Sequence, residues 1–212
     1  MTSAYIGTKE NARKNEILSA ASKRRSIYSL GRNIPVSETR IREIVEEALR
    51  QAPSPFNIQS ARAVILSESL HEELWDHLAG LMKNIVKDPA ALAQTVAKLG
   101  GFRAAKGTVL FFEDQAPITA MQQAFPTYAD KFPVWSLQSS GMAQYLVWTA
   151  FAQEGLGANL QHYDPLVNEW IYEKASVPRT WKVISQMTFG EILAPAGEKS
   201  FQPIGERVKV LA

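Results

Sequence analysis

The sequence predicts an α+β fold with one central sheet, and three observations lead to this expectation. Short apolar runs that suit strands are interleaved with amphipathic helical segments, without a regular βαβ repeat. The chain has 212 residues, which fits one large domain, and no internal repeat or linker rich in Pro, Gly or Ser divides it. Apolar residues make up 46% and charged residues 21%, as in an ordinary globular protein.

The N-terminal end differs in pattern from the rest of the chain. We expect residues 1–22 to be peripheral, since they are polar and Ala-rich with a helical pattern over 10–21, and a single domain should follow over 23–212. Ser37 suits a helix N-cap, and Pro53 and Pro55 end that helix because proline lacks an N–H group. The elements expected in the first half are a helix after Ser37, an ordered loop over 52–60, a strand over 61–66, a helix over 70–85 and a helix from Asp88-Pro89 to Gly100-Gly101.

The second half begins with a strong strand signal, because residues 107–113 are a short apolar run bounded by charge. Residues 136–153 form the most apolar helix, and a helix that is apolar nearly all round belongs in a domain centre or a subunit interface. Asp164-Pro165 has the residues of a helix start. The remaining expected elements are short helices and loops over 115–135, strands over 158–161 and 181–189, and a candidate strand over 207–211.

Composition excludes several functional classes. Lys and Arg total 23 against 21 Asp and Glu, so the net charge of +2 does not predict binding to nucleic acid. Cysteine is absent, which excludes disulfides, thiolate metal sites and cysteine nucleophiles and fits a cytoplasmic location. The apolar stretches are short and interrupted by charge, so neither a signal peptide nor a membrane span is expected.

No pattern indicates a metal centre or a catalytic triad. His71 and His77 are six residues apart, which places them on different faces of a helix, and we interpret both as solvated surface residues. A G-x-S-x-G motif is absent, and so is any cysteine. We therefore predict no metal ligand and no catalytic side chain.

Three polar segments remain, each with an ordinary alternative. Arg24, Arg25 and Ser26 combine two guanidinium forks and a hydroxyl, which suits a phosphate, although a basic run is more often simply solvated. The loop over 52–60 projects polar groups from a proline-stiffened backbone, or is a rigid turn capped by its own side chains. In residues 154–163, one interpretation is that the glycines let a flat ligand approach the backbone closely. The alternative is that they only end a helix before a strand.

Taken together, the motifs resemble the FMN-dependent nitroreductase family, in particular a short branch with fungal members and copper-induced bacterial members. The resemblance rests on the stretches RRSIYSL, APSPFNIQSAR, GLGANLQHY and MTFGE and on a terminal K-x-F-x-P segment, and it extends from Lys23 to Leu211. It implies a mixed, mainly antiparallel sheet flanked by helices. It also implies an intertwined homodimer with FMN at the interface.

The resemblance also implies which residues bind the cofactor. Arg24, Arg25 and Ser26 match the segment that holds the FMN phosphate and ribityl chain, and either Lys199 or Arg207 adds a basic contact. The residues that match the loop reaching the flavin from the other subunit are Pro53, Ser54, Asn57 and Gln59. The residues that match the turn whose backbone faces the ring are Leu160, Gln161 and His162. Candidates for the acceptor site, for which ordinary packing is the more common role, are Phe56, Phe125, Tyr128 and Trp135.

The implied activity is a ping-pong oxidoreduction in two steps. NAD(P)H first gives hydride to N5 of FMN, and a small aromatic acceptor, which is a nitroaromatic compound or a quinone, then takes it from the flavin. A flavin supplies the redox chemistry itself, which agrees with the lack of a catalytic side chain. Two alternatives stay open. One is a relative of flavin-dependent dehalogenases or flavin destructases, and the other is a flavin-binding regulator of the lipid or oxidative-stress response with incidental reductase activity.

Overall fold

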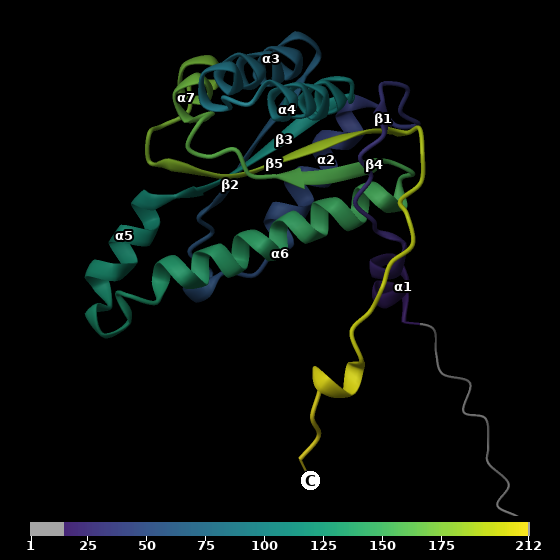
Figure 1. Cartoon of the computed structure of the whole chain (residues 1–212). Helices are drawn as coiled ribbons and strands as arrows, with labels where there is room; N and C mark the ends of the chain where they lie inside the picture. Colours follow the sequence, from purple (N-terminus) through teal and green to yellow (C-terminus); the bar gives the residue numbers. More distant parts are fainter. Residues whose placement is uncertain (1–14, 212) are drawn as a thin grey trace, which may run out of the picture.

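The computed structural model describes residues 15–211, which fold around one five-stranded sheet (Figure 1). Its strands are β1 (Leu30–Gly31), β2 (Ala61–Ser67), β3 (Gly107–Asp114), β4 (Gly157–Gln161) and β5 (Trp181–Ile192). β5 pairs with β3, β4 and β1, and β2 pairs with β3, all antiparallel. An isolated bridge between Ser26 and Ala158 is parallel. The predicted α+β fold with a mainly antiparallel sheet is therefore confirmed.

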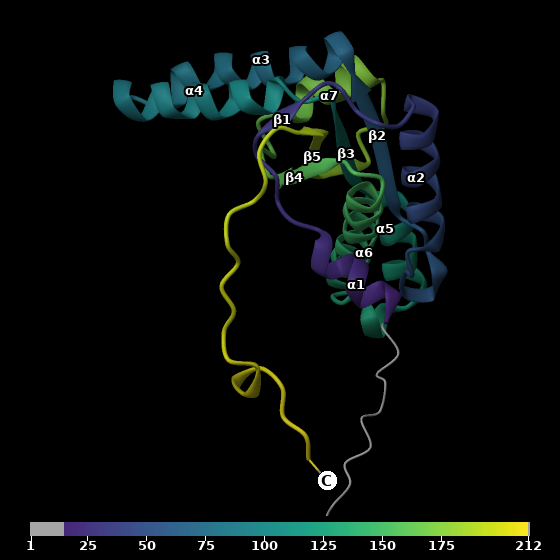
Figure 2. The ribbon, with the colours of Figure 1, turned by 90° about the vertical axis from the view of Figure 1, so that its right-hand side faces the viewer.

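Helices cover both faces of this sheet. They are α1 (Glu16–Lys23), α2 (Glu38–Gln51), α3 (Glu68–Ile85), α4 (Pro89–Arg103), α5 (Gln115–Ala124), α6 (Phe132–Gln153) and α7 (Asn168–Ala175). One apolar core lies between the sheet and α2 with α6, and a second lies between the opposite face and α3, α4 and α7. Figure 2 shows that α3 and α4 project beyond the sheet as a pair, and that the C-terminal segment runs away from the rest of the chain.

Local signals explain why the best-predicted elements form where they do. The Ser37 hydroxyl accepts a hydrogen bond from the Arg40 amide at 3.1 Å, and the Asp88 carboxylate accepts one from the Ala91 amide at 2.7 Å. Both residues thus cap a helix N-terminus, as predicted. Every residue of β3 is buried, which agrees with the unbroken apolar run in the sequence.

Three predicted helix boundaries and one predicted strand are wrong. Helix α4 continues through Gly100-Gly101 to Arg103, since two exposed glycines weaken a helix without ending it. Helix α6 begins at Phe132 rather than 136, because Pro133 lies in the first turn, where a missing N–H costs nothing. Residues 164–167 form a turn, so α7 begins only at Asn168. Residues 207–211 pair with no strand of the part of the chain described here and are exposed.

At the N-terminus, α1 overlaps the helix predicted over 10–21, of which residues 10–14 lie outside the described residues. Helix α1 buries none of its side chains and lies against α6. The division of the chain at residue 22 stays a prediction. Strand β1 and the short 3-10 turns, at Pro55–Asn57, Pro126–Tyr128 and Ile204–Glu206, were not predicted.

His71 is buried, so its predicted place on the surface is wrong, and His77 is half-buried. The His71 Nε2 lies 3.1 Å from the Arg103 carbonyl oxygen and donates to it, while Nδ1 lies 2.9 Å from the Thr108 hydroxyl and accepts from it. Burial, helped by the charge of Arg32, lowers the pKa of His71 to about 4. The neutral imidazole is therefore part of the fold.

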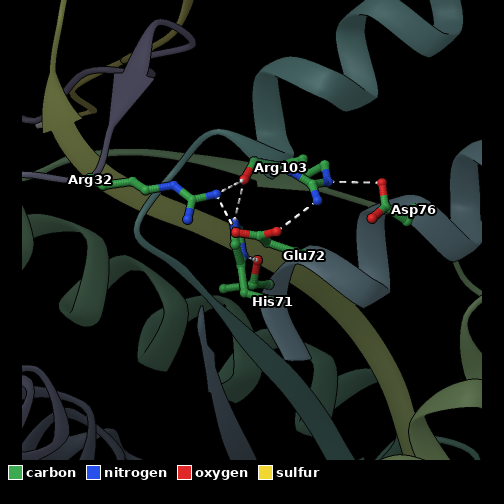
Figure 3. A network of polar contacts seen from close by, with 6 residues as sticks. Arg32, His71, Glu72, Asp76 and Arg103 are labelled. Carbon is green, nitrogen blue, oxygen red and sulfur yellow. Dashed lines mark hydrogen bonds and ion pairs between the residues drawn. The ribbon is translucent and has the colours of Figure 1, made fainter. Parts of the chain in front are cut away.

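Ion pairs surround this histidine (Figure 3). Arg103 pairs with Asp76 at 2.8 Å and with Glu72 at 2.6 Å, and Arg32 pairs with Glu72 from the other side at 2.5 Å. The network joins the residue after β1 to α3 and α4. It ties the short edge strand to the helices on one face of the sheet.

Candidate functional site

The Arg24–Ser26 segment lies beside β4, so two of the predicted site segments are brought together. Ser26 forms the parallel bridge with Ala158, and the Ile27 amide donates to the Ala158 carbonyl oxygen at 2.9 Å. The Asn159 side-chain amide, which is fully buried, donates to the Ile27 carbonyl oxygen at 2.8 Å. These contacts join residues more than a hundred positions apart, which no local pattern in the sequence could predict.

Aromatic rings hold the Arg24 guanidinium in place. Its central carbon lies 4.3 Å from the centre of the Trp148 ring and 5.8 Å from that of Tyr145, both on α6. Trp148 is itself fixed, because its indole N–H donates to the Ala158 carbonyl oxygen at 3.1 Å. The buried Nε of Arg24 has no hydrogen-bond partner within residues 15–211. A stacked guanidinium with a buried, unused donor is suited to receive an anionic oxygen.

A cavity of about 540 Å³ opens next to this arginine. Its lining includes three cationic residues, Arg24, Arg25 and Lys199, together with the hydroxyl of Ser26 and one carboxylate, that of Glu198, so positive charge predominates. Arg25 also donates to the Gly197 carbonyl oxygen at 2.6 Å, which fixes the C-terminal segment against the cavity. Of the two C-terminal candidates for a phosphate contact, Lys199 lines this cavity, whereas Arg207 lies farther along the exposed tail.

The predicted turn after α6 is strand β4 and the residue that follows it. Gly155 ends α6 with a φ of 79°, a conformation that favours glycine. Leu160 is half-buried, Gln161 is buried and donates to the Asn159 side chain at 2.8 Å, and His162 is exposed. The Gln161 side chain is thus engaged inside the protein, and a ligand near this strand would meet mainly its backbone.

The loop from Pro53 to Ser60, which we call the 53–60 loop, is held in an unusual conformation. Phe56, Asn57 and Gln59 have φ values of 52°, 55° and 48°, in the region that non-glycine residues rarely adopt. The Gln59 amide donates to the Ser54 hydroxyl at 3.0 Å, which closes the loop on itself. Such strain is concentrated at functional sites in proteins and persists only where the surroundings enforce it.

Two grooves adjoin the 53–60 loop. One, of about 430 Å³, is lined by Pro53, Ser54, Phe56 and Trp135 among others. The other, of about 390 Å³, is lined by Pro53, Ser54, Gln59 and Arg62 among others. Ser139 of α6 lines both grooves. Three of the four predicted cofactor residues of this loop therefore face concave surfaces, and the fourth, Asn57, is exposed.

The four aromatic residues predicted for the acceptor site form one cluster. Phe56 lies 4.9 Å from Phe125 between ring centres, and Tyr128 lies 6.0 Å from Trp135. Phe132, which was not predicted, joins the two pairs by contacting Phe56 at 5.6 Å and Trp135 at 5.4 Å. Phe56, Phe125 and Tyr128 are substantially exposed, so the cluster presents aromatic surface rather than only filling a core.

The predicted residues thus form two groups in the chain. The first, around Arg24–Ser26, β4 and Lys199, is basic, and the second, around the 53–60 loop and the aromatic cluster, is polar and aromatic. Residues missed from the sequence are Trp148 and Tyr145 in the first group and Phe132 and Ser139 in the second. The sequence shows Trp148 and Tyr145 as large aromatic residues on an apolar helix. Their contact with Arg24 could be recognised only from the three-dimensional structure.

A model of the nitroreductase family matches residues 21–191, which is most of the chain and includes both groups except Lys199. The chain belongs to the nitroreductase family. Membership of this family indicates an oxidoreductase, so the predicted family and enzyme class are confirmed at this level.

Individual proteins are similar to this nitroreductase-family chain over most of its length. Nitroreductase FRM2 of Saccharomyces cerevisiae is 36% identical over 186 residues, which are 87% of this chain and 92% of FRM2. Nitroreductase CinD from Lactococcus lactis, solved in complex with nicotinic acid, is 45% identical with a TM-score of 0.84, covering 92% of this chain and all of CinD. A protein from Desulfovibrio desulfuricans, solved with FMN, is 22% identical with a TM-score of 0.63 over 94% of this chain and 98% of its own, which is a likeness of fold.

The described residues hold neither a cluster of metal ligands nor a membrane-spanning helix. Within residues 15–211, no three His, Asp or Glu side chains are grouped closely enough to hold a metal ion. Over the same part of the chain, no helix combines the length and the apolar character needed to cross a membrane.

Proposed function

We propose that this protein is an NAD(P)H-dependent FMN oxidoreductase that reduces nitroaromatic compounds, and quinones, by a ping-pong reaction. The observation that carries the proposal is the basic cavity of about 540 Å³, where Arg24, Arg25, Ser26 and Lys199 converge. The buried, unpartnered Nε of Arg24 fits a phosphate oxygen, which would give this donor the acceptor it lacks among the described residues. The match to CinD, which has been solved with 4-nitrophenol, supports the class of acceptor.

In this proposal the chain binds and orients, while the cofactor supplies the redox chemistry. When bound, FMN would accept hydride from a nicotinamide and give it to an aromatic acceptor. Arg24, Arg25, Ser26 and Lys199 would hold the phosphate and the adjoining ribityl chain, with Trp148 keeping Arg24 in position. The backbone of Leu160–His162 would face the flat ring. No side chain is assigned the role of an obligatory acid or base.

The aromatic cluster would form the acceptor side of the site. The exposed surfaces of Phe56, Phe125 and Tyr128, together with Trp135, offer ring faces and edges against which a flat aromatic acceptor can pack. The groove of about 430 Å³ next to Phe56 and Trp135 has room for a small molecule. Its open shape supports a permissive choice of acceptor.

We further propose that the protein is a homodimer in which the 53–60 loop of one copy completes the basic cavity of the other. Apolar side chains on the outer side of α6 are exposed, and so are those of the C-terminal segment. Those of the C-terminal segment are Leu193, Phe201, Ile204, Val208, Val210 and Leu211. Exposed apolar surface on this scale marks an interaction site. A second copy of the chain is the partner that would unite the two groups of site residues.

Replacing both Phe201 and Ile204 with Ser should convert the dimer into monomers at micromolar concentration. Each side chain is at least two-thirds exposed in the single chain, and burying both against a partner contributes roughly 3–6 kcal/mol per chain. Sedimentation velocity measures the change. The matched control is Ile85→Ser, which removes an exposed apolar residue at the end of α3 and should leave the dimer intact. A double variant that still sediments as a dimer would contradict the proposed role of the tail.

The proposed activity predicts a yellow protein whose flavin absorbance disappears when NADH or NADPH is added without oxygen. Adding 4-nitrophenol or a quinone should then restore the absorbance, because the reduced cofactor passes its electrons to the acceptor. Stopped-flow spectroscopy measures both half-reactions. A protein that takes up no FMN would contradict the proposal. If the protein binds flavin but NAD(P)H does not reduce that flavin, the regulatory alternative is favoured.

A further inference from the structure

Glu113 is a buried carboxyl group that the proposed function does not use. It lies at the end of β3, opposite Ala61 of β2, and is 1% exposed. One of its oxygens, Oε2, accepts a hydrogen bond from the Ser60 hydroxyl at 2.5 Å. The other, Oε1, is buried and has no hydrogen-bond partner within residues 15–211. A carboxylate accepts several hydrogen bonds when it is satisfied, so this site is poorly suited to the charged form.

The surroundings of Glu113 supply little compensating charge. Arg62 on β2 and Asp114 on β3 act on its charge and pair with each other at 3.0 Å, and Lys182 on β5, whose side chain is exposed, stands opposite Glu113 in the sheet. Helix α6 faces it with the hydroxyl of Ser140, whose oxygen accepts a hydrogen bond from Gln144 at 2.9 Å and whose O–H remains a donor that favours the charged form of Glu113. Burial raises the pKa of Glu113 to about 7 despite the opposing effects of Ser60 and Arg62. Both forms are therefore accessible near neutral pH.

Glu113 is connected directly to the 53–60 loop through the last residue of that loop. Besides the bond from the Ser60 hydroxyl to Glu113, the Asp114 amide donates to the Ser60 carbonyl oxygen at 2.9 Å. Arg62 donates to the Gln59 carbonyl oxygen at 2.6 Å. These anchors hold the end of a loop that contains three non-glycine residues at positive φ. A strained loop relaxes when its anchor weakens, so its shape depends on the state of Glu113.

We propose that Glu113 is a positioning residue whose neutral form holds the 53–60 loop in the shape that binds the flavin, an inference that rests on the FMN-binding function proposed above. Ionisation places a charge on a buried group whose second oxygen lacks a donor. The charged form is satisfied when water reaches it, and water enters by displacing Ser60 and the loop. Raising the pH thus loosens the loop and weakens flavin binding, although Glu113 does not touch the flavin.

The experiment measures the dissociation constant of FMN by quenching of its fluorescence, using the full chain freed of flavin. The wild-type affinity should fall about tenfold from about pH 5 to about pH 7.5 and then level off. In Glu113→Gln, which keeps an acceptor for Ser60 and cannot ionise, the affinity should stay high across this range. His71→Gln is the matched control, since it removes another buried titratable group, one that does not contact the loop, and should keep the wild-type profile.

A second variant and a second measurement guard against simple misfolding. Ser60→Ala keeps Glu113 but cuts its link to the loop, so FMN binding should be weaker and less dependent on pH. Hydrogen exchange of the amides of residues 54–60 in the flavin-free chain, corrected for intrinsic rates, should show protection that falls as the pH rises from about 5 to about 7.5 in wild type and not in Glu113→Gln.

The outcomes separate this inference from the proposed function. FMN binding that does not change with pH in the wild type, or a Glu113→Gln profile equal to that of the wild type, overturns the role of Glu113 and leaves the flavoprotein intact. A chain that binds no FMN at any pH overturns the proposed function instead. In that case loop protection across the pH range still decides whether Glu113 controls the loop.

Discussion

Relative to wild type, the variant His71→Gln becomes more stable as the pH falls from about 7 to about 4.5, and Glu113→Gln becomes less stable. The pKa of His71 is lowered to about 4 in the folded protein, below its value of 6.5 in an unfolded chain. Its contribution to stability is fully present above pH 6.5 and is lost as the pH falls towards 4. The loss amounts to about 3 kcal/mol, from 1.36 kcal/mol for each pKa unit.

Glu113 changes the stability of the folded protein with pH in the direction opposite to that of His71. Its pKa is raised to about 7 in the folded protein, above the ordinary value of 4.5. Its contribution is fully present below pH 4.5 and is lost as the pH rises through 7, again by about 3 kcal/mol. Between about pH 4.5 and 6.5, His71 and Glu113 therefore change the unfolding free energy of the wild type in opposite directions. Each variant removes one of the two effects, so the effect of the other group becomes visible.

Urea unfolding at a series of pH values tests this pair of effects. The quantity to compare is the difference in unfolding free energy between each variant and wild type, because titration of the remaining groups then cancels. His71→Gln keeps an N–H that can donate to the Arg103 carbonyl oxygen, so the loss of the ring does not by itself remove this contact. Difference curves that are flat with pH for both variants would show that neither group titrates differently on folding.

Replacing Arg24 with Ala should weaken FMN binding by about 100-fold. The guanidinium lies over Trp148, and Arg24 lines the basic cavity with a donor that has no partner within residues 15–211, so the side chain is already in place when an anion arrives. A hydrogen bond to a charged group contributes about 1.5–3 kcal/mol, which corresponds to about 10- to 150-fold in affinity. Isothermal titration of the flavin-free protein with FMN measures the loss.

Two further variants make this test specific. Lys199→Ala should weaken binding less than Arg24→Ala, since the lysine side chain is flexible and lies over the exposed ring of Phe201. Arg42→Ala removes an exposed arginine of α2 that pairs with Glu46 on the same helix and should leave FMN binding unchanged. If Arg24→Ala retains FMN as tightly as Arg42→Ala, the phosphate does not bind in this cavity.

The elements that were predicted well are those whose cause is local. Residues 107–113 form a strand because an unbroken apolar run is buried on both faces, and α2 begins at a side chain that caps it. Strand β1 could not be predicted, because two residues have no periodicity. The strand predicted over 207–211 failed because alternation gives a strand only where a partner strand exists.

The histidine error had a signal that could have prevented it. His71 stands three, four and seven residues before Leu74, Trp75 and Leu78, which is the spacing of a buried helix face. The distance to His77 shows only that the two histidines do not share a face. Periodicity over the whole helix decides burial, and the polar partners of His71 come from β3 and α4, which the sequence does not place beside it.

For the candidate site, residue types were predicted and spatial relations were not. The basic character of Arg24–Ser26 is evident in the sequence, whereas their contact with β4 depends on pairing across more than a hundred residues. Glu113 had a visible signal, since it is the first charged residue after the apolar run of a buried strand. Its link to Ser60 follows from the register of β2 on β3, which the sequence alone leaves undetermined.

The backbone of the 53–60 loop has a consequence for the thermodynamics of ligand binding. Three side chains at positive φ and two anchored ends leave the loop few conformations, so its entropy is lost when the chain folds and not when a ligand arrives. While Glu113 is neutral, binding at this loop then begins from a surface that is already ordered. Its free energy can come almost wholly from contacts and released water, with little ordering to oppose it.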